Sequence, residues 1–251
     1  MKVVILCGGE GTRLKEETEF KPKPLVEVGG KPILWHIMKI YSYFGFNDFV
    51  LALGYKGEMI KDYFASSKNE EGFKVACVDT GLKSLTGERI RLLESYLEGD
   101  EFMVTYGDGV ANVDIKKLLE FHHSQKTVGT ITGVHPVSRF GLIEKDEATK
   151  KIRAFHQVTI VSMSRDKENF KEIRHIPSKD YINGGFMVFK KEFLAYLKPD
   201  SMIEETFTPL IEEQELSVFE HEGPWKAMDT YRDVEELNQF WEKYPFWKVW
   251  K

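Results

Sequence analysis

The strongest constraint in this sequence is a regular alternation of short apolar runs and amphipathic segments over its first 134 residues. The apolar runs have the length of strands and few polar interruptions, which is typical of strands buried on both faces of a sheet. Such an alternation predicts βαβ units, a mainly parallel sheet and right-handed crossovers. We expect strands at 2–7, 48–53, 73–79, 101–105 and 127–134, and helices at 32–44, 57–65, 87–97 and from Asp114.

The alternation changes after residue 134. Segments 141–145 and 151–156 have the pattern of a hairpin, and the polar stretch 157–181 indicates a long loop. We therefore expect an α/β fold in one domain, 1–251, with a Rossmann-like, mixed but mostly parallel sheet flanked by helices and a small β-rich lobe. The later elements are expected as strands at 184–189 and 216–221 and as helices at 191–197, 204–213 and from residue 230.

Composition excludes several classes of protein. The formal net charge is −5, whereas binding to the nucleic-acid backbone depends on a basic excess, so we expect no nucleic-acid partner. No stretch approaches the ~20 apolar residues of a membrane helix, and the apolar run 3–7 is too short for a signal peptide. We expect a soluble, cytoplasmic protein without a membrane partner. Cys7 and Cys77 lie in apolar runs and are expected to be buried free thiols.

The first strand runs directly into the glycine-rich loop Gly8-Gly9-Glu10-Gly11. Glycines let a backbone approach a ligand closely and turn its N–H groups toward phosphate oxygens. The loop has neither the G-K-[ST] ending of a Walker loop nor the G-x-G-x-x-G spacing, and a bare tight turn is the alternative. Arg13 and the stiff K-P-K-P segment that contains Lys23 favour a phosphate site, because both supply positive charge nearby.

Two aspartates stand where a metal bridging phosphates is expected. Asp108 lies between glycines at the end of strand 101–105, although a simple Asp-Gly turn also explains it. Asp229 lies just before Thr230 and Asp233, which form a [ST]-x-x-[DE] capping box for the last helix. The box accounts for Thr230 and Asp233 but not for Asp229, which is therefore available as a second metal ligand.

The loop after strand 73–79 contains two Thr-Gly pairs. Its backbone groups are placed to contact a base edge, and Ser84, Thr86 and Arg89 are placed to add side-chain contacts. The alternative is an ordinary loop with an exposed arginine. Both interpretations stay open at this point.

Taken together, these segments resemble the sugar-1-phosphate nucleotidyltransferases, and within them the glucose-1-phosphate cytidylyltransferase group. The resemblance spans nearly the whole chain. It implies a GT-A nucleotidyltransferase type of fold, CTP and a sugar 1-phosphate as substrates, Mg²⁺ as cofactor and a homo-oligomer. The segments that carry it are GGEGTRL (8–14) with Lys23, VEVGGKPIL (26–34), DTG (79–81), TYGDGVANVDI (105–115), RFG (139–141), INGGF (182–186) and MDTYRD (228–233).

The resemblance also assigns roles to residues of this chain. Arg13 and Lys23 are expected to contact phosphates and act in catalysis, and Asp108 and Asp229 to hold the metal. The half 1–134 is expected to bind the nucleotide and the half 135–251 the acceptor, through Gly141, Lys179 and Asn183. The expected nucleotide-binding residues are Leu6, Cys7, Gly8, Gly9, Glu10, Gly11, Thr12, Ser84, Thr86, Arg89 and Gly107.

One departure concerns the acceptor. The family carries a sugar-binding E-K-P motif, and here the corresponding positions are Gln157-Val158-Thr159. The lysine of that motif is replaced by a valine, and Lys179 is the candidate substitute. The acceptor is therefore expected to be glucose 1-phosphate or a related phosphorylated molecule. Two alternative functions are a GT-A glycosyltransferase and a non-catalytic nucleotide-binding paralogue.

Overall fold

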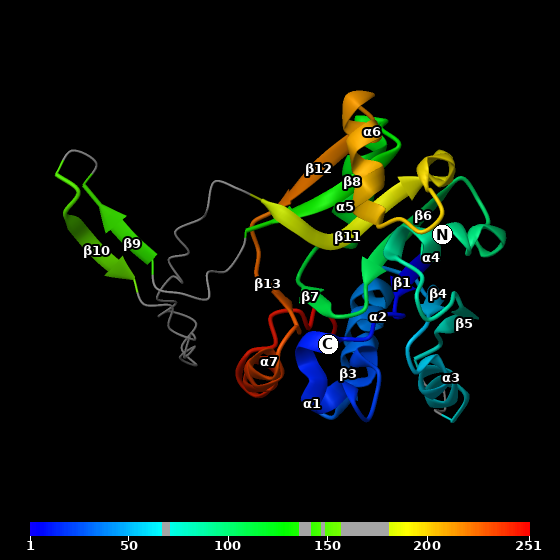
Figure 1. The fold of residues 1–251 in the computed structure, drawn as a ribbon, viewed down its shortest axis with the longest axis horizontal. Coiled ribbons are helices and arrows are strands. Elements are labelled where there is room, and N and C mark those ends of the chain that lie inside the picture. The colour runs from blue at the N-terminus through cyan, green and yellow to red at the C-terminus, as the bar shows by residue number, and fades with distance from the viewer. Residues whose placement is uncertain (67–70, 136–141, 147–148, 157–180) are drawn as a thin grey trace. The chain divides into compact units, whose positions relative to one another are not determined.

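A computed structural model describes residues 1–66, 71–135, 142–146, 149–156 and 181–251. Its centre is a seven-stranded sheet in the order β12-β8-β11-β6-β1-β4-β5 (Figure 1). β1 pairs in parallel with β4 and β6, and β11 runs antiparallel to β6, so the predicted mixed, mostly parallel sheet is confirmed. The strands are β1 (Lys2–Leu6), β4 (Asp48–Leu53), β5 (Lys74–Asp79), β6 (Glu101–Tyr106), β8 (Gly129–Val134), β11 (Ile182–Lys190) and β12 (Leu216–His221).

Both faces of the sheet are covered, and β1 shows why its sequence is continuously apolar. Val3 and Ile5 belong to one buried cluster and Val4 and Leu6 to the other, because successive side chains of a strand point to opposite faces. Residues of α2 (Ile33–Tyr43), α3 (Gly57–Ser66), α5 (Ile115–Gln125) and α7 (Tyr231–Lys243) join the first cluster, and residues of α4 (Thr86–Arg91) and α6 (Phe207–Glu212) join the second.

Several helices differ from the predicted boundaries. The predicted helix 87–97 is divided into α4 and a 3-10 turn, η3 (Glu94–Tyr96), where the Leu93 N–H bonds to the Ile90 carbonyl three residues back. This tightening keeps both Leu93 and Leu97 buried. The predicted helices 191–197 and 204–213 are likewise a 3-10 helix, η4 (Lys191–Tyr196), and a 3-10 start, η5 (Ile203–Thr206), before α6.

Short elements that have no recognisable periodicity complete the fold. β7 (Gly109–Ala111) pairs antiparallel with β13 (Trp225–Ala227), placing Gly109 opposite Ala227. This ribbon brings the segment after Asp108 beside the segment before Asp229. The other short elements are η1 (Thr12–Leu14), α1 (Lys15–Thr18), η2 (Lys23–Leu25) and the pair β2 (Glu27–Val28) and β3 (Lys31–Pro32).

The chain divides into two compact units. One contains Met1–Val134 and Asn183–Lys251, and the other contains His135–Ile182. Within the second unit, β9 (Leu142–Lys145) and β10 (Ile152–His156) form the predicted antiparallel hairpin. Its connection is held by Asp146, whose carboxylate accepts the Thr149 N–H at 2.7 Å.

The aromatic C-terminal segment packs on the body of the protein. Trp247 is fully buried, and its indole N–H donates to His36 Nδ1 at 3.2 Å. The other ring nitrogen of His36 bonds to the Val28 carbonyl at 2.8 Å, so the ring is neutral with its proton on Nε2. Burial lowers the pKa of His36 to about 4.

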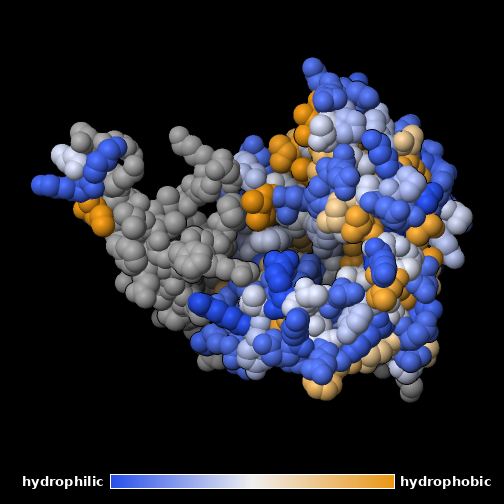
Figure 2. Space-filling model, in the orientation of Figure 1, coloured by the Kyte–Doolittle hydropathy of each residue, from blue (hydrophilic) through white to orange (hydrophobic). Residues whose placement is uncertain are grey.

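Figure 2 shows hydrophobic residues scattered over a mostly hydrophilic face. Among the described residues, no helix has the length and apolar character that crossing a membrane requires. Cys7 is buried as predicted, and burial raises its pKa. The prediction that Cys77 is buried is wrong, because it is half-buried on β5, the edge strand of the sheet.

Candidate active site

A cleft of about 270 Å³ lies within the larger unit, around the carboxyl ends of β1 and β6. Ligands of open α/β sheets bind at this edge. Its lining brings together residues that are far apart in the sequence: Leu6, Cys7, Gly8, Gly9, Lys23, Pro24, Ser84, Leu85, Thr86, Arg89, Tyr106, Gly107, Asp108 and Met202.

Two glycines of the cleft, Gly8 and Gly107, lie too close to their neighbours for a side chain to fit. A Cβ on Gly8 would stand 2.2 Å from the guanidinium carbon of Arg89, and one on Gly107 would stand 2.9 Å from the Leu6 carbonyl oxygen. Gly11 has φ of +63°, a left-handed conformation that favours glycine. Gly9 has open space around it. The predicted residues Glu10, Gly11 and Thr12 continue the loop but do not line the cleft.

Lys23 lines the cleft and lies in the 3-10 turn between Pro22 and Pro24. Its ammonium is 2.6 Å from Asp108 Oδ2 and 2.9 Å from Asp229 Oδ1, and 11% of the side chain is exposed. Burial alone would lower the pKa of Lys23, but the two carboxylates outweigh it and raise the pKa. Lys21, from the same K-P-K-P segment, lies 4.0 Å from Glu17 instead.

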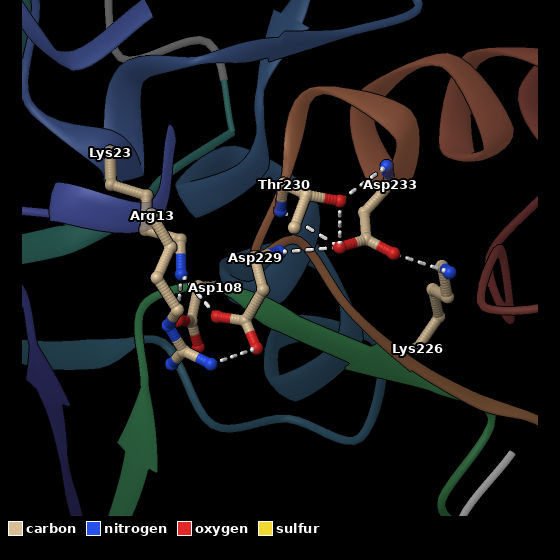
Figure 3. Close-up of polar contacts among 7 residues, drawn as sticks. All are labelled: Arg13, Lys23, Asp108, Lys226, Asp229, Thr230 and Asp233. Atoms are coloured by element: carbon tan, nitrogen blue, oxygen red, sulfur yellow. Dashed lines mark hydrogen bonds and ion pairs between the residues drawn. The ribbon is translucent and has the colours of Figure 1, made fainter. Parts of the chain in front are cut away.

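Arg13 extends the same charged group. Its guanidinium is 3.1 Å from Asp229 Oδ2, and 73% of its side chain is exposed (Figure 3). The four residues Arg13, Lys23, Asp108 and Asp229 therefore form one network, although they come from four separate segments. An exposed arginine whose partner is a carboxylate can exchange that partner for a phosphate at little cost.

The arrangement of the aspartates suits a divalent metal. Both carboxylates converge on one cation, the Lys23 ammonium, so they face a common centre. Magnesium is commonly held by one or two carboxylates together with substrate phosphates and water. In the part of the chain that the structure describes, no group of three or more His, Cys, Asp or Glu residues is placed to hold a metal. A metal between Asp108 and Asp229 would therefore complete its shell with phosphate oxygens and water.

Arg89 lines the cleft, but its donors are used within the protein. It is buried, and its guanidinium donates to the carbonyls of Leu53 at 2.8 Å, Gly81 at 2.8 Å and Gly8 at 3.0 Å. It also bonds to the Thr80 hydroxyl at 2.7 Å. The alternative of an exposed loop arginine is excluded, because Arg89 is buried and bonds to carbonyls of three separate segments.

The hydroxyls of Ser84 and Thr86 also have partners in the protein. Ser84 donates to the Thr80 carbonyl, and Thr86 Oγ1 accepts the Ile203 N–H at 2.9 Å. These bonds tie the Ser84 and Thr86 side chains, which line the cleft, to neighbouring segments of the chain. Met202 also lines the cleft. Its sulfur accepts a contact from the Thr86 hydroxyl at 3.8 Å, and no sequence signal links it to the site.

Of the three predicted acceptor-binding residues, the structure describes only Asn183, which does not line this cleft. Asn183 begins the larger unit's second segment, where its side chain accepts the Gly185 N–H at 2.9 Å. Gly141 and Lys179 lie outside the described residues, as does Gln157-Val158-Thr159. Sequence reasoning also missed four lining residues, namely Pro24, Leu85, Tyr106 and Met202.

Known proteins of similar sequence and fold identify the family of this chain. The chain is 40% identical, with both chains covered completely, to a "Probable glucose-1-phosphate cytidylyltransferase" of Bacillus subtilis and to a glucose-1-phosphate cytidylyltransferase of Salmonella typhimurium. The solved structure of HddC from Yersinia pseudotuberculosis with GMP-PN has a TM-score of 0.70 at 24% identity, covering 96% of this chain and 99% of that one. That structural likeness bears on the fold alone. The model of the nucleotidyl transferase family matches residues 2–244, and the chain belongs to this family.

Proposed function

We propose that this protein transfers CMP from CTP to a sugar 1-phosphate, releasing pyrophosphate and forming a CDP-sugar. The observation that carries the proposal is the ammonium of Lys23, which is held between Asp108 and Asp229 in a cleft that glycines also line. The names of the relatives that are 40% identical over the full length support CTP and glucose 1-phosphate as the first pair to test.

In the proposed reaction, an oxygen of the acceptor phosphate attacks the α-phosphorus of CTP in line. A new P–O bond forms, the bond from the α-phosphorus to the bridging oxygen breaks, and its electron pair leaves with pyrophosphate. No general base is required, because a phosphate monoester is already ionised near neutral pH. Lys23 and Arg13 stabilise charge on the α-phosphate and the leaving group, so catalysis rests on positioning and electrostatics.

Asp108 and Asp229 would hold a divalent cation, which we propose to be Mg²⁺. When bound, such an ion neutralises charge on the phosphates. Lys23 shares both carboxylates in this structure, so it is placed to move from the aspartates to the α-phosphate when metal and nucleotide enter together. The glycine loop and residue Gly107 would contact the nucleotide through their backbone.

The acceptor end of the proposal is broader. Gly141, Lys179 and Asn183 remain the proposed contacts to the sugar phosphate. Lys179 would substitute for the lysine of the family's E-K-P motif, whose position is occupied here by Val158. We further propose that the protein is cytoplasmic and forms a homo-oligomer. Size-exclusion chromatography with light scattering tests the assembly, and a monomer at micromolar concentration contradicts it.

A pyrophosphate-release screen tests the function directly. Four nucleoside triphosphates are combined with several sugar 1-phosphates in the presence of Mg²⁺. The expected result is release with CTP and glucose 1-phosphate or a close relative. Release with another triphosphate overturns the donor, and consumption of a nucleotide sugar without pyrophosphate identifies a glycosyltransferase. Binding of CTP without turnover across the panel identifies a non-catalytic paralogue.

A further inference from the structure

Asp233 lies one helical turn beyond Asp229 and outside the cleft lining. It is 3% exposed. Its Oδ2 accepts the Asp229 N–H at 3.1 Å, the Thr230 N–H at 2.8 Å and the Thr230 hydroxyl at 2.8 Å (Figure 3). Its Oδ1 accepts from the Lys226 ammonium at 2.6 Å. One buried carboxylate thus joins the start of α7, the Asp229 backbone and β13.

Helix capping explains only part of this arrangement. A capping box requires the Thr230 hydroxyl to accept the Asp233 N–H and the Asp233 side chain to accept the Thr230 N–H. The bond from the Asp229 N–H lies one residue before the cap and contributes nothing to the box. Since both N–H groups meet the same oxygen, Asp233 orients the two peptide planes that flank the Asp229 Cα. Their orientation sets the direction in which the Asp229 carboxylate points.

The opposite side of Asp229 is fixed as well. The Met228 N–H donates to the Asp108 carbonyl at 2.8 Å, which continues the β7–β13 ribbon to the two aspartates. Lys226 belongs to β13 and holds the second oxygen of Asp233, so Asp233 is tied to the ribbon that carries Asp108. Asp233 therefore links the Asp229 backbone to the same ribbon that carries Asp108.

We propose that Asp233 is a positioning residue that aims the Asp229 carboxylate at the metal. The proposal rests on the proposed function, in which Asp229 is a metal ligand. Outer-shell partners of metal ligands typically change affinity by 10–100-fold when they are replaced. Asp233 would act through the backbone of Asp229 and would not touch the metal or either substrate.

Asp233→Glu separates positioning from capping. Glutamate is the usual third residue of a capping box, so α7 keeps its cap and the melting temperature stays within a few degrees of the original. The longer side chain cannot keep its carboxylate on both Asp229 and Lys226. We expect Mn²⁺ affinity, measured by electron paramagnetic resonance with CTP and without acceptor, to fall roughly 10-fold. Unchanged affinity overturns the proposal.

Three companion variants complete the test. Asp233→Asn cannot present acceptors to the N–H groups and to Lys226 together, so affinity is expected to fall at least as far as with glutamate. Glu236→Gln is the matched control, because Glu236 also binds Lys226, at 2.5 Å, but makes no contact with Asp229. It is expected to keep the original affinity, and an equal loss there attributes the effect to Lys226 instead. Asp229→Asn shows the effect of losing the proposed metal ligand itself. If this variant leaves Mn²⁺ binding unchanged, Asp229 is not a metal ligand, and the proposed function fails at that point.

Discussion

Two regions in and beside the cleft hold positive charge in different ways. Among the described residues, the ion pairs of Lys23 and Arg13 are with carboxylates, which phosphates and a metal can replace. In the second region, Arg89 is buried and donates to carbonyl oxygens of three segments of its own chain. A cation paired with side chains is available for chemistry, whereas a cation paired with backbone carbonyls maintains the shape of the site.

Lys23→Ala is expected to have the largest effect and tests the first half of this comparison. The rate of pyrophosphate release falls roughly 10²-fold or more, because charge stabilisation of the transition state is lost. The fold survives, as measured by circular dichroism. Lys21→Ala is the matched control, since Lys21 lies in the same segment but pairs only with Glu17. Near-normal turnover of Lys23→Ala contradicts the assigned role.

Arg89→Lys tests the second half. A lysine reaches fewer of the carbonyl groups, so buried acceptors lose partners and the free energy of unfolding falls by about 2–3 kcal/mol. The KM for CTP rises because the loops lose their closure, while kcat changes less. Arg91→Lys is the control on the same helix. Arg91 is partly exposed and bonds to the Glu88 carboxylate rather than to backbone carbonyls, so its replacement is expected to cost less, about 1 kcal/mol. If stability is unchanged and kcat falls sharply, Arg89 acts in catalysis rather than in maintaining the shape of the site.

His36 provides a third case, a buried side chain that is kept neutral by its surroundings. The folded pKa of about 4 lies below the ordinary 6.5, so the unfolded chain binds the extra proton between these values. His36 therefore contributes its full stability above pH 6.5, and on the order of 2 kcal/mol is lost by pH 5. Denaturant unfolding of the protein and of His36→Gln at pH 5 and 8 measures this. If the free energy of unfolding of His36→Gln depends on pH as strongly as that of the original protein, other groups cause the loss of stability. His122 and His221 are candidates, because burial also lowers their pKa values.

Arg13→Lys is expected to give the smallest change. The exposed pair with Asp229 adds little to stability, so the melting temperature is unchanged. The rate falls roughly 10-fold, because an ammonium cannot reproduce the two-pronged contact of a guanidinium with phosphate. Steady-state kinetics with CTP decides the matter, and an unaltered rate removes Arg13 from the catalytic group.

The sequence predicted the sheet well because buried parallel strands leave a continuous apolar pattern. The boundaries of β4 and β12 agree with the predicted ranges, and the Asp114 cap of α5 is confirmed by its bonds to the Lys116 and Lys117 N–H groups. The 3-10 segments were missed because they share the apolar spacing of α-helices. The β7–β13 ribbon was missed because three-residue strands carry no readable period.

At the site, the charged residues that lie together leave a signal in the sequence, whereas several residues of the cleft lining leave none. Lys23, Asp108 and Asp229 are charged residues next to glycines, prolines or a cap, and each leaves a local signal. Met202 is an ordinary apolar residue whose place in the cleft depends on how η5 packs on α4. Arg89 has a local signal, but its partners come from loops that only the folded chain brings together.

The position of β11 has a consequence for synthesis on the ribosome. β11 is the neighbour of both β6 and β8, yet it follows β6 in the chain by the long stretch that ends at Ile182. At about 5–20 residues per second, a nascent chain waits roughly 4–15 s between completing β6 and making β11. During that time the open edge of β6 is a template on which another chain can add a strand. The risk of aggregation is therefore greatest during translation, before β11 pairs with β6 and covers its open edge.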